Sequence, residues 1–231
     1  MKVRQLDNNL ISANKSEALR YLRYKSNIVD DETTKLLEES IAELKEISNL
    51  QYVYKIFDII KENDNIFFKD SMINIKSKDL RDLFKHSDKS AIMAATLGFE
   101  VEKKIKYYSL TNLSKAVVFD ACAASYIEAL CDFAEAEIKK LAFKDGCNIT
   151  FRYSPGYGDV SISHQASILA ALNTQKLIGL SVSDSSILIP RKSVTAFIGF
   201  TKYKEQNKKS CLNCNLFGNC SYSKGGESCV K

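Results

Sequence analysis

A short run beginning at Arg152, Arg-Tyr-Ser-Pro-Gly-Tyr-Gly-Asp, combines ligand-binding side chains with a sharp turn. Pro155 followed by Gly156 is typical of a type II β-turn, because proline fixes φ and glycine supplies the positive φ that follows. Arg152 offers a planar guanidinium to a carboxylate, and Tyr157 offers a ring and a hydroxyl. This combination suits a nucleoside that carries an amino acid. The alternative is a plain connecting turn, with Arg152 solvated or paired with Asp159.

Four cysteines near the C-terminus form a second candidate site, with the spacing Cys211-x2-Cys214-x5-Cys220-x8-Cys229. A Cys-x-x-Cys pair lets two sulfurs reach one ion, and four thiolates suit tetrahedral zinc or an iron–sulfur cluster. The spacing does not distinguish the two metals. The alternative is a tail whose thiols are incidental, although neighbouring lysines favour the thiolate form that binds metal.

The net charge of +5 is concentrated in this tail. Residues 201–231 contain six lysines and two glutamates, whereas the preceding 200 residues contain 27 basic and 26 acidic side chains. This balance predicts no nucleic-acid-binding surface, and no apolar stretch approaches the roughly 20 residues that would cross a membrane. No signal peptide is recognisable at the start, so we expect a cytoplasmic protein. We also expect a domain at 1–200 and a basic, Cys-rich tail at 201–231.

The other three cysteines, Cys122, Cys131 and Cys147, lie in apolar surroundings and are interpreted as small core residues. Two of them fall within residues 111–143, the longest expected helix, which contains neither proline nor glycine. At 1.5 Å per residue this helix would run roughly 45–50 Å. A break near Asp120 is left open.

Strands and helices are expected to cluster along the chain. Ser16 and Ser77 are expected to cap helices, and alternating apolar residues from Tyr52 onward predict a strand. Further strands are expected at 66–68, 72–75, 90–97, 148–153, 177–182, 187–189 and 193–200, with a helix at 163–173. Because no regular βαβ alternation is present, we predict an α+β fold. It would have a twisted, mainly antiparallel sheet, flanking helices and an N-terminal helical region over about residues 1–50.

Taken together, these motifs resemble the activation (reactivation) domain of cobalamin-dependent methionine synthase. In that family an Arg-x-x-x-Gly-Tyr turn precedes a Thr/Ser-Glu/Asp-Ser segment, a proline and a Ser-Val strand. Here the run at Arg152 is followed by Ser-Asp-Ser-Ser-Ile-Leu-Ile-Pro-Arg-Lys-Ser-Val from Ser183. The segments ALRYLRYK (18–25), MAATLG (93–98) and DACAASYIEAL (120–130) resemble free-standing members of the family. The similarity covers about residues 15 to 200.

The resemblance implies a binding site for S-adenosylmethionine. The positions that match the family's ligand contacts are Arg152, Ser154, Gly156, Tyr157 and Glu128. Ser154 and Gly156 match backbone contacts. The alternative for Glu128 is a solvated position on the helix surface. An N-terminal aspartate of the family has no match here, and Tyr203 stands in for a tyrosine pair only at a shortened spacing.

The resemblance also implies a role as an accessory subunit in the methyltransferase class. The chain would support reductive remethylation of cob(II)alamin in a separate methionine synthase chain, with flavodoxin or ferredoxin as electron donor. Cobalt would be the nucleophile, so no catalytic base is expected here. Consistent with this role, the chain has no GxGxxG loop and no Asp-x-His-x-x-Gly cobalamin-binding motif. The alternatives are an iron–sulfur redox activator of another corrinoid methyltransferase, or a non-catalytic S-adenosylmethionine-binding module.

Overall fold

The computed structural model describes residues 1–24 and 29–203. The metal site predicted at Cys211, Cys214, Cys220 and Cys229 lies outside the described residues, so it stays a prediction, as does the separate tail at 201–231.

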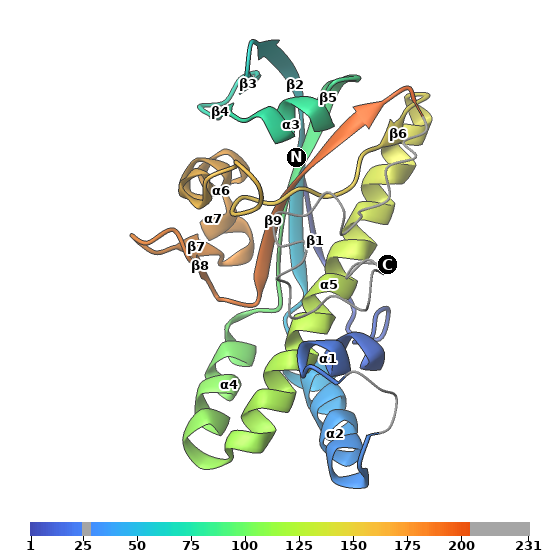
Figure 1. Ribbon diagram of the computed structural model, residues 1–231, viewed down its shortest axis with the longest axis vertical. Helices are drawn as coiled ribbons and strands as arrows, with labels where there is room; N and C mark the ends of the chain where they lie inside the picture. Colours follow the sequence, from blue (N-terminus) through green and yellow to red (C-terminus); the bar gives the residue numbers. More distant parts are fainter. Residues whose placement is uncertain (25–28, 204–231) are drawn as a thin grey trace.

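The centre of the fold is an open, seven-stranded sheet in which all pairings are antiparallel (Figure 1). Its order is β4-β3-β2-β5-β9-β6, and β1 pairs with the first residues of β2. A separate hairpin is formed by β7 and β8. The strands are β1 (Lys2–Gln5), β2 (Gln51–Glu62), β3 (Asn65–Phe68), β4 (Asn74–Lys76), β5 (Ser87–Thr96), β6 (Asn148–Ile149), β7 (Ser181–Val182), β8 (Leu188–Ile189) and β9 (Ser193–Thr201).

Helices cover both faces of the sheet, which confirms the predicted α+β class. They are α1 (Lys15–Tyr21), α2 (Asp31–Ile47), α3 (Lys78–Leu83), α4 (Phe99–Thr111), α5 (Leu113–Lys144), the 3-10 helix η1 (Ile162–His164), α6 (Gln165–Leu172) and α7 (Thr174–Ile178). No helix in the described part of the chain is long and apolar enough to cross a membrane.

Alternate residues of each central strand point into two different hydrophobic cores. The first core lies between the sheet and helices α1, α2, α4 and α5, and receives Tyr52 and Tyr54 from β2. The second lies between the opposite face and α3, α6 and α7, and receives Val53 and Phe57. Burial of each large side chain contributes about 1.5–3 kcal/mol. The sheet is therefore held from both sides.

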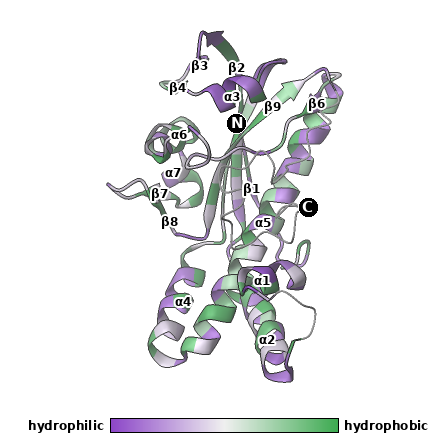
Figure 2. Ribbon diagram, viewed as in Figure 1, coloured by the Kyte–Doolittle hydropathy of each residue, from purple (hydrophilic) through white to green (hydrophobic). Residues whose placement is uncertain are grey.

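Helix α5 is the main support of the first core and of the site described below. It spans 32 residues, or about 48 Å at 1.5 Å per residue. Hydrophobic and hydrophilic residues are mixed along it (Figure 2), because one side packs on the sheet and another faces outward. Its buried residues include Cys122 and Cys131, which places these two cysteines in the core, as predicted, while Cys147 is half-buried.

The helix is continuous at Asp120, where the sequence left a break open. Instead the chain bends at Asn112, which has φ −155° and ψ 93° and separates α4 from α5. The Asn112 side chain accepts a hydrogen bond from the N–H of Lys115 and caps α5. Asp120 lies within α5, and its side chain forms an ion pair with Lys192. A capping asparagine, not an acidic residue, therefore sets the helix boundary.

Three local predictions were wrong. Asn14, not Ser16, caps α1, since its side chain accepts from the N–H groups of Ser16 and Glu17. The strand expected at 148–153 is regular only over β6, because the Thr150 hydroxyl takes the place of a backbone acceptor for the N–H of Gly199. The strand expected at 177–182 is mostly helix α7, which ends at Gly179 with φ +65°. The Ser77 cap of α3 is confirmed.

Candidate functional site

The Pro-Gly corner forms the turn that its residues predict. Gly156 has φ +94°, and the N–H of Tyr157 donates to the carbonyl of Ser154 at 3.3 Å. The N–H of Gly156 donates to the carbonyl of Val160 at 2.8 Å. These two N–H groups are therefore bonded within the loop. Backbone carbonyls accept two bonds each, so the carbonyls of the turn are the groups left for a ligand. The Tyr157 side chain is 70% exposed.

A hydrogen-bond network ties this corner to α3. The Tyr153 hydroxyl lies 3.0 Å from Asp79 Oδ2 and 3.1 Å from the Tyr157 carbonyl, and the N–H of Asp159 donates to Asp79 Oδ2 at 3.2 Å. Asp159 in turn accepts from Ser77 and, at 2.7 Å, from the N–H of Lys78. The position of Tyr157 is thus set by groups on both sides of it.

Gly158 completes the network because a Cβ at its position would meet two of the network's oxygens. Its φ is +51°, and a Cβ there would lie 1.9 Å from Asp79 Oδ2 and 2.1 Å from the Tyr153 hydroxyl. Any side chain would have to displace both oxygens from their hydrogen bonds. Asp79 and Tyr153 were not among the predicted site residues, although Tyr153 lies inside the motif.

Arg152 does not pair with Asp159 but with three carboxylates of α5. Nη1 lies 2.7 Å from Glu135 and 2.8 Å from Asp132, and Nη2 donates to Glu128 at 3.0 Å. The Arg152 side chain is only 10% exposed, whereas Glu128 is 48% exposed. Burial opposes the charge, but the Cys131 sulfur and the carboxylates outweigh it and raise the pKa of Arg152. The guanidinium therefore stays positively charged.

The geometry brings Arg152 and Glu128 together, as the predicted ligand site requires. With Asp132 and Glu135, the site has three negative charges and one positive charge. Ser154, Gly156 and Tyr157 follow directly along the corner. Of the five predicted residues, Glu128 therefore lies on α5 and the other four in the loop after β6.

Tyr21, at the end of α1, borders the same region. Burial and the neighbouring Glu128 carboxylate raise the pKa of its hydroxyl to about 12, and Tyr157 adds to the effect. The guanidinium of Arg20 lies 4.7 Å from the centre of the Tyr21 ring. Tyr21 was not predicted as a site residue, although it lies in the ALRYLRYK segment on which the resemblance partly rests.

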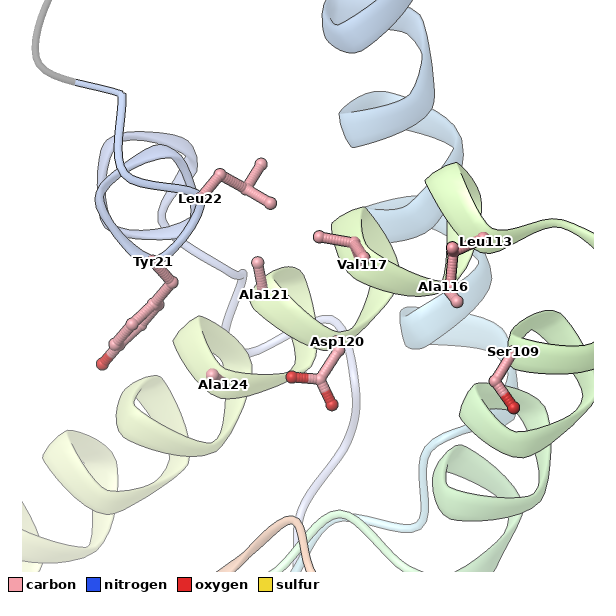
Figure 3. A pocket seen from close by; sticks show the side chains of 9 residues that line it. All are labelled: Tyr21, Leu22, Ser109, Leu113, Ala116, Val117, Asp120, Ala121 and Ala124. Carbon is pink, nitrogen blue, oxygen red and sulfur yellow. The ribbon is translucent and has the colours of Figure 1, made fainter.

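A groove of about 420 Å³ continues from Tyr21 along α5 (Figure 3). Tyr21 ends α1 and Leu22 follows it on one side of α5, Ser109 comes from α4 on the other, and Asp120 lies between them. The lining residues are Tyr21, Leu22, Ser109, Leu113, Ala116, Val117, Asp120, Ala121 and Ala124. Lys192 Nζ contacts both the carboxylate and the backbone carbonyl of Asp120, each at 3.0 Å.

Within residues 1–24 and 29–203, no group of three or more His, Cys, Asp and Glu side chains is arranged to hold a metal ion. Tyr203, the suggested substitute for the family's tyrosine pair, lies beside His86, with ring centres 4.6 Å apart.

Neither family models nor the sequences of curated proteins match this chain. Among solved structures, it is similar to the crystal structure of the MetH reactivation domain bound to AdoHcy, with a TM-score of 0.63. This chain has the fold of that reactivation domain. The likeness covers 90% of this chain and 81% of the other at 14% sequence identity. At such low identity the likeness supports the architecture that the sequence motifs imply.

Proposed function

We propose that this protein binds S-adenosylmethionine where the Arg152 corner meets α5. The observation that carries the proposal is the ion pair between the buried Arg152 guanidinium and the half-exposed carboxylate of Glu128. The fold shared with a reactivation domain solved with AdoHcy supports the same ligand class.

The amino-acid end of the ligand would exchange partners with this ion pair. Its carboxylate would replace Glu128 at Nη2 of Arg152, a charge-assisted bond of the stronger kind. Glu128, once released, would accept from the ligand ammonium group. Each charge that loses a partner would gain another, so the exchange leaves no buried charge unpaired. Asp132 and Glu135 would hold Nη1 throughout.

The remaining charge of the site favours a sulfonium over a neutral thioether. Three carboxylates surround one guanidinium, so the region keeps a net negative charge. S-adenosylmethionine carries one more positive charge than S-adenosylhomocysteine. Opposite charges at a partly exposed site attract by a few kcal/mol at most. We therefore expect S-adenosylmethionine to bind more tightly than S-adenosylhomocysteine. The amino-acid ends of the two ligands should make the same contacts.

Beyond binding, the proposed role is methyl transfer, in which the bound sulfonium donates its methyl group to the cobalamin of a separate methionine synthase chain. The partner's cobalamin, reduced by one electron from a flavodoxin or ferredoxin, supplies the nucleophile. The electron pair of the S–CH₃ bond stays on sulfur, so S-adenosylhomocysteine is the second product. The task of this chain is to hold the sulfonium in line, which lowers the entropic cost of reaction.

Titration calorimetry with S-adenosylmethionine tests the binding step. Arg152→Lys keeps the charge but loses the planar fork, and should weaken binding about tenfold, the scale of one lost hydrogen bond to a charged group. Arg81→Lys is the matched control, because Arg81 also contacts two carboxylates, Asp64 and Asp82, away from the corner. Absence of binding to the wild type at millimolar ligand would overturn the proposal, as would equal affinity of the Arg152 variant.

A methyl-transfer assay tests the proposed role in remethylation of the partner's cobalamin. The chain would be mixed with a cobalamin-loaded methionine synthase in the cob(II)alamin state, a reduced flavodoxin and methyl-labelled S-adenosylmethionine. We expect label on cobalamin only when the wild-type chain is present. Binding without any stimulation would instead support a non-catalytic binding module. Iron in anaerobically purified protein would support the redox activator.

A further inference from the structure

We propose that two copies of this chain associate through helix α4, each copy presenting the same face of α4 to the other. This face, the α4 face, consists of Phe99, Lys103, Lys106, Tyr107 and Leu110. The association goes beyond the proposed ligand binding, because none of these residues lies in the Arg152 corner or lines the groove along α5. Helix α4 stands at the outside of the fold, beside the first turns of α5 (Figure 1).

The α4 face combines exposed apolar side chains with the spacing of a helix-pairing seam. Phe99, Tyr107 and Leu110 are 52%, 56% and 80% exposed, although the opposite side of α4 is buried in the first core. The residues of the face recur at intervals of three and four positions, the spacing by which two helices pack side by side. Single exposed apolar side chains are common, but a row of them marks an interaction site.

The charges of α4 favour a second copy as the partner of this face. The acidic residues of the helix, Glu100 and Glu102, lie in its first turn, and its lysines, Lys103, Lys104 and Lys106, follow. A two-fold axis across the helix sets the two copies antiparallel and makes residue i meet residue j while j meets i. The acidic end of each α4 then lies beside the basic end of the other, which favours this orientation over a parallel one.

Lys103 lies at the centre of this arrangement. Glu100 and Lys106 are each three positions from it, so with the axis at Lys103 the Glu100 carboxylate is level with the partner's Lys106. Phe99 and Tyr107 are each four positions from it, so these two rings are level as well, and aromatic pairs favour offset or edge contacts. Lys103 itself is neutralised by Glu100 at 2.7 Å, which reduces the repulsion between the two lysines at the axis.

A hollow beside α4 would receive the partner's Phe99. It has a volume of about 380 Å³ and is lined by Ile47, from the end of α2, and by Glu100, Lys103, Lys104 and Tyr107. A cavity of about 150 Å³ holds a benzene ring, so a phenyl side chain fits. Each copy thus supplies one projecting ring and one hollow, and a two-fold pair uses each of them once.

The association is expected to be weak because the interface is small. Helix α4 has 13 residues, which is about 20 Å at 1.5 Å per residue. Standard interfaces bury about 800 Å² on each partner, and smaller ones belong to transient complexes. We therefore expect dimers with a dissociation constant on the order of 10 µM.

Sedimentation velocity of the full chain over about 1–500 µM, under reducing conditions, tests the association. Tyr107→Asp removes one ring of the face and adds a charge. Phe143→Asp is the matched control, because Phe143 is 79% exposed near the end of α5, outside the α4 face. Thermal unfolding verifies that each variant is folded. We expect a monomer–dimer equilibrium in the wild type, an association weaker by about tenfold or more in Tyr107→Asp, the scale of a lost anchor residue, and no change in Phe143→Asp.

A charge exchange tests the antiparallel pairing. Lys106→Glu and Glu100→Lys each place like charges level with one another and should weaken self-association, whereas a mixture of the two variants should form dimers as the wild type does. A wild type that stays monomeric up to about 500 µM would overturn the proposal. A dimer that Tyr107→Asp weakens no more than Phe143→Asp would overturn it too, since another face would then hold the copies together. Variants that associate no better when mixed than alone would overturn the two-fold antiparallel pairing.

Discussion

Gly158 offers the sharpest test of how the corner is held. In Gly158→Ala the new Cβ would meet Asp79 Oδ2 and the Tyr153 hydroxyl at 1.9 and 2.1 Å. Both atoms are the ends of side chains and can move, so the cost is the hydrogen bonds that they make. The single proton of the Tyr153 hydroxyl is shared between Asp79 Oδ2 and the Tyr157 carbonyl, and the Asp159 N–H donates to Asp79 Oδ2.

The magnitude follows from these contacts. A positive φ costs alanine about 1 kcal/mol relative to glycine. Loss of both hydrogen bonds, that of the Tyr153 hydroxyl and that of the Asp159 N–H, adds about 2 kcal/mol. Gly156→Ala is the matched control in the same loop, since Gly156 also has a positive φ but no atom lies within 4 Å of its Cβ position. We therefore expect Gly158→Ala to lower the free energy of unfolding by about 3 kcal/mol and Gly156→Ala by about 1 kcal/mol.

Urea unfolding followed by far-ultraviolet circular dichroism measures both values, and the chain has no tryptophan to use as a fluorescent probe. A difference of 2 kcal/mol is a factor of about 30 in the ratio of folded to unfolded protein. Because the network also positions Tyr157, Gly158→Ala should weaken binding of S-adenosylmethionine several-fold more than Gly156→Ala does. Equal stabilities of the two variants would refute the reasoning, and equal affinities would show that the network does not position the ligand site.

Three further predictions concern other contacts. Hydrogen bonds from Ser77 and Lys78 outweigh burial and hold the pKa of Asp159 below 3.8. Asp159→Asn should therefore lower the free energy of unfolding by its full amount at pH 7 and by less as the pH falls below 3.8. A loss in urea unfolding that does not change with pH would contradict this. Burial raises the pKa of Cys122 to about 12, so peptide-resolved alkylation at pH 8 should label half-buried Cys147 well before Cys122, and equal rates would argue against the core position. Ser125 accepts from the N–H of Asn14 at 2.7 Å and donates to its carbonyl at 3.0 Å, so Ser125→Ala should cost about 1–2 kcal/mol of unfolding free energy, and an unchanged value would show that α1 is held by packing alone.

Local patterns predicted the elements whose signals are strong in the sequence itself. The alternation from Tyr52 predicted β2, the run without glycine or proline predicted α5, and Ser77 predicted the cap of α3. Predictions failed where contacts between distant parts of the chain determine the local backbone structure. In the strand expected at 148–153, for example, the Thr150 hydroxyl replaces a backbone acceptor for the N–H of Gly199.

The candidate site was predictable only in part, for the same reason. The Pro-Gly corner is encoded by consecutive residues, and Arg152 stands out beside it. The carboxylates that bind Arg152 do not stand out in the sequence, because Asp132 and Glu135 become its neighbours only when α5 packs beside the corner. Tyr21 and Asp79 are separated from the corner by more than 70 residues, so no local pattern could assign them to it.

The division of the central strands between two cores has a consequence for how this protein can vary. In β5, Ala91, Met93 and Ala95 face one core while Ile92 and Ala94 face the other. Inserting or deleting a single residue there would exchange the two sets, because side chains alternate between faces. Both cores would then be filled wrongly at once, with no solvated face to absorb the error. Insertions and deletions should accordingly be tolerated in the loop between β7 and β8 and excluded from β5 and β9. The Arg152 corner is paired to β9 through Tyr153 and Phe197, so its position relative to the sheet is fixed by the same constraint.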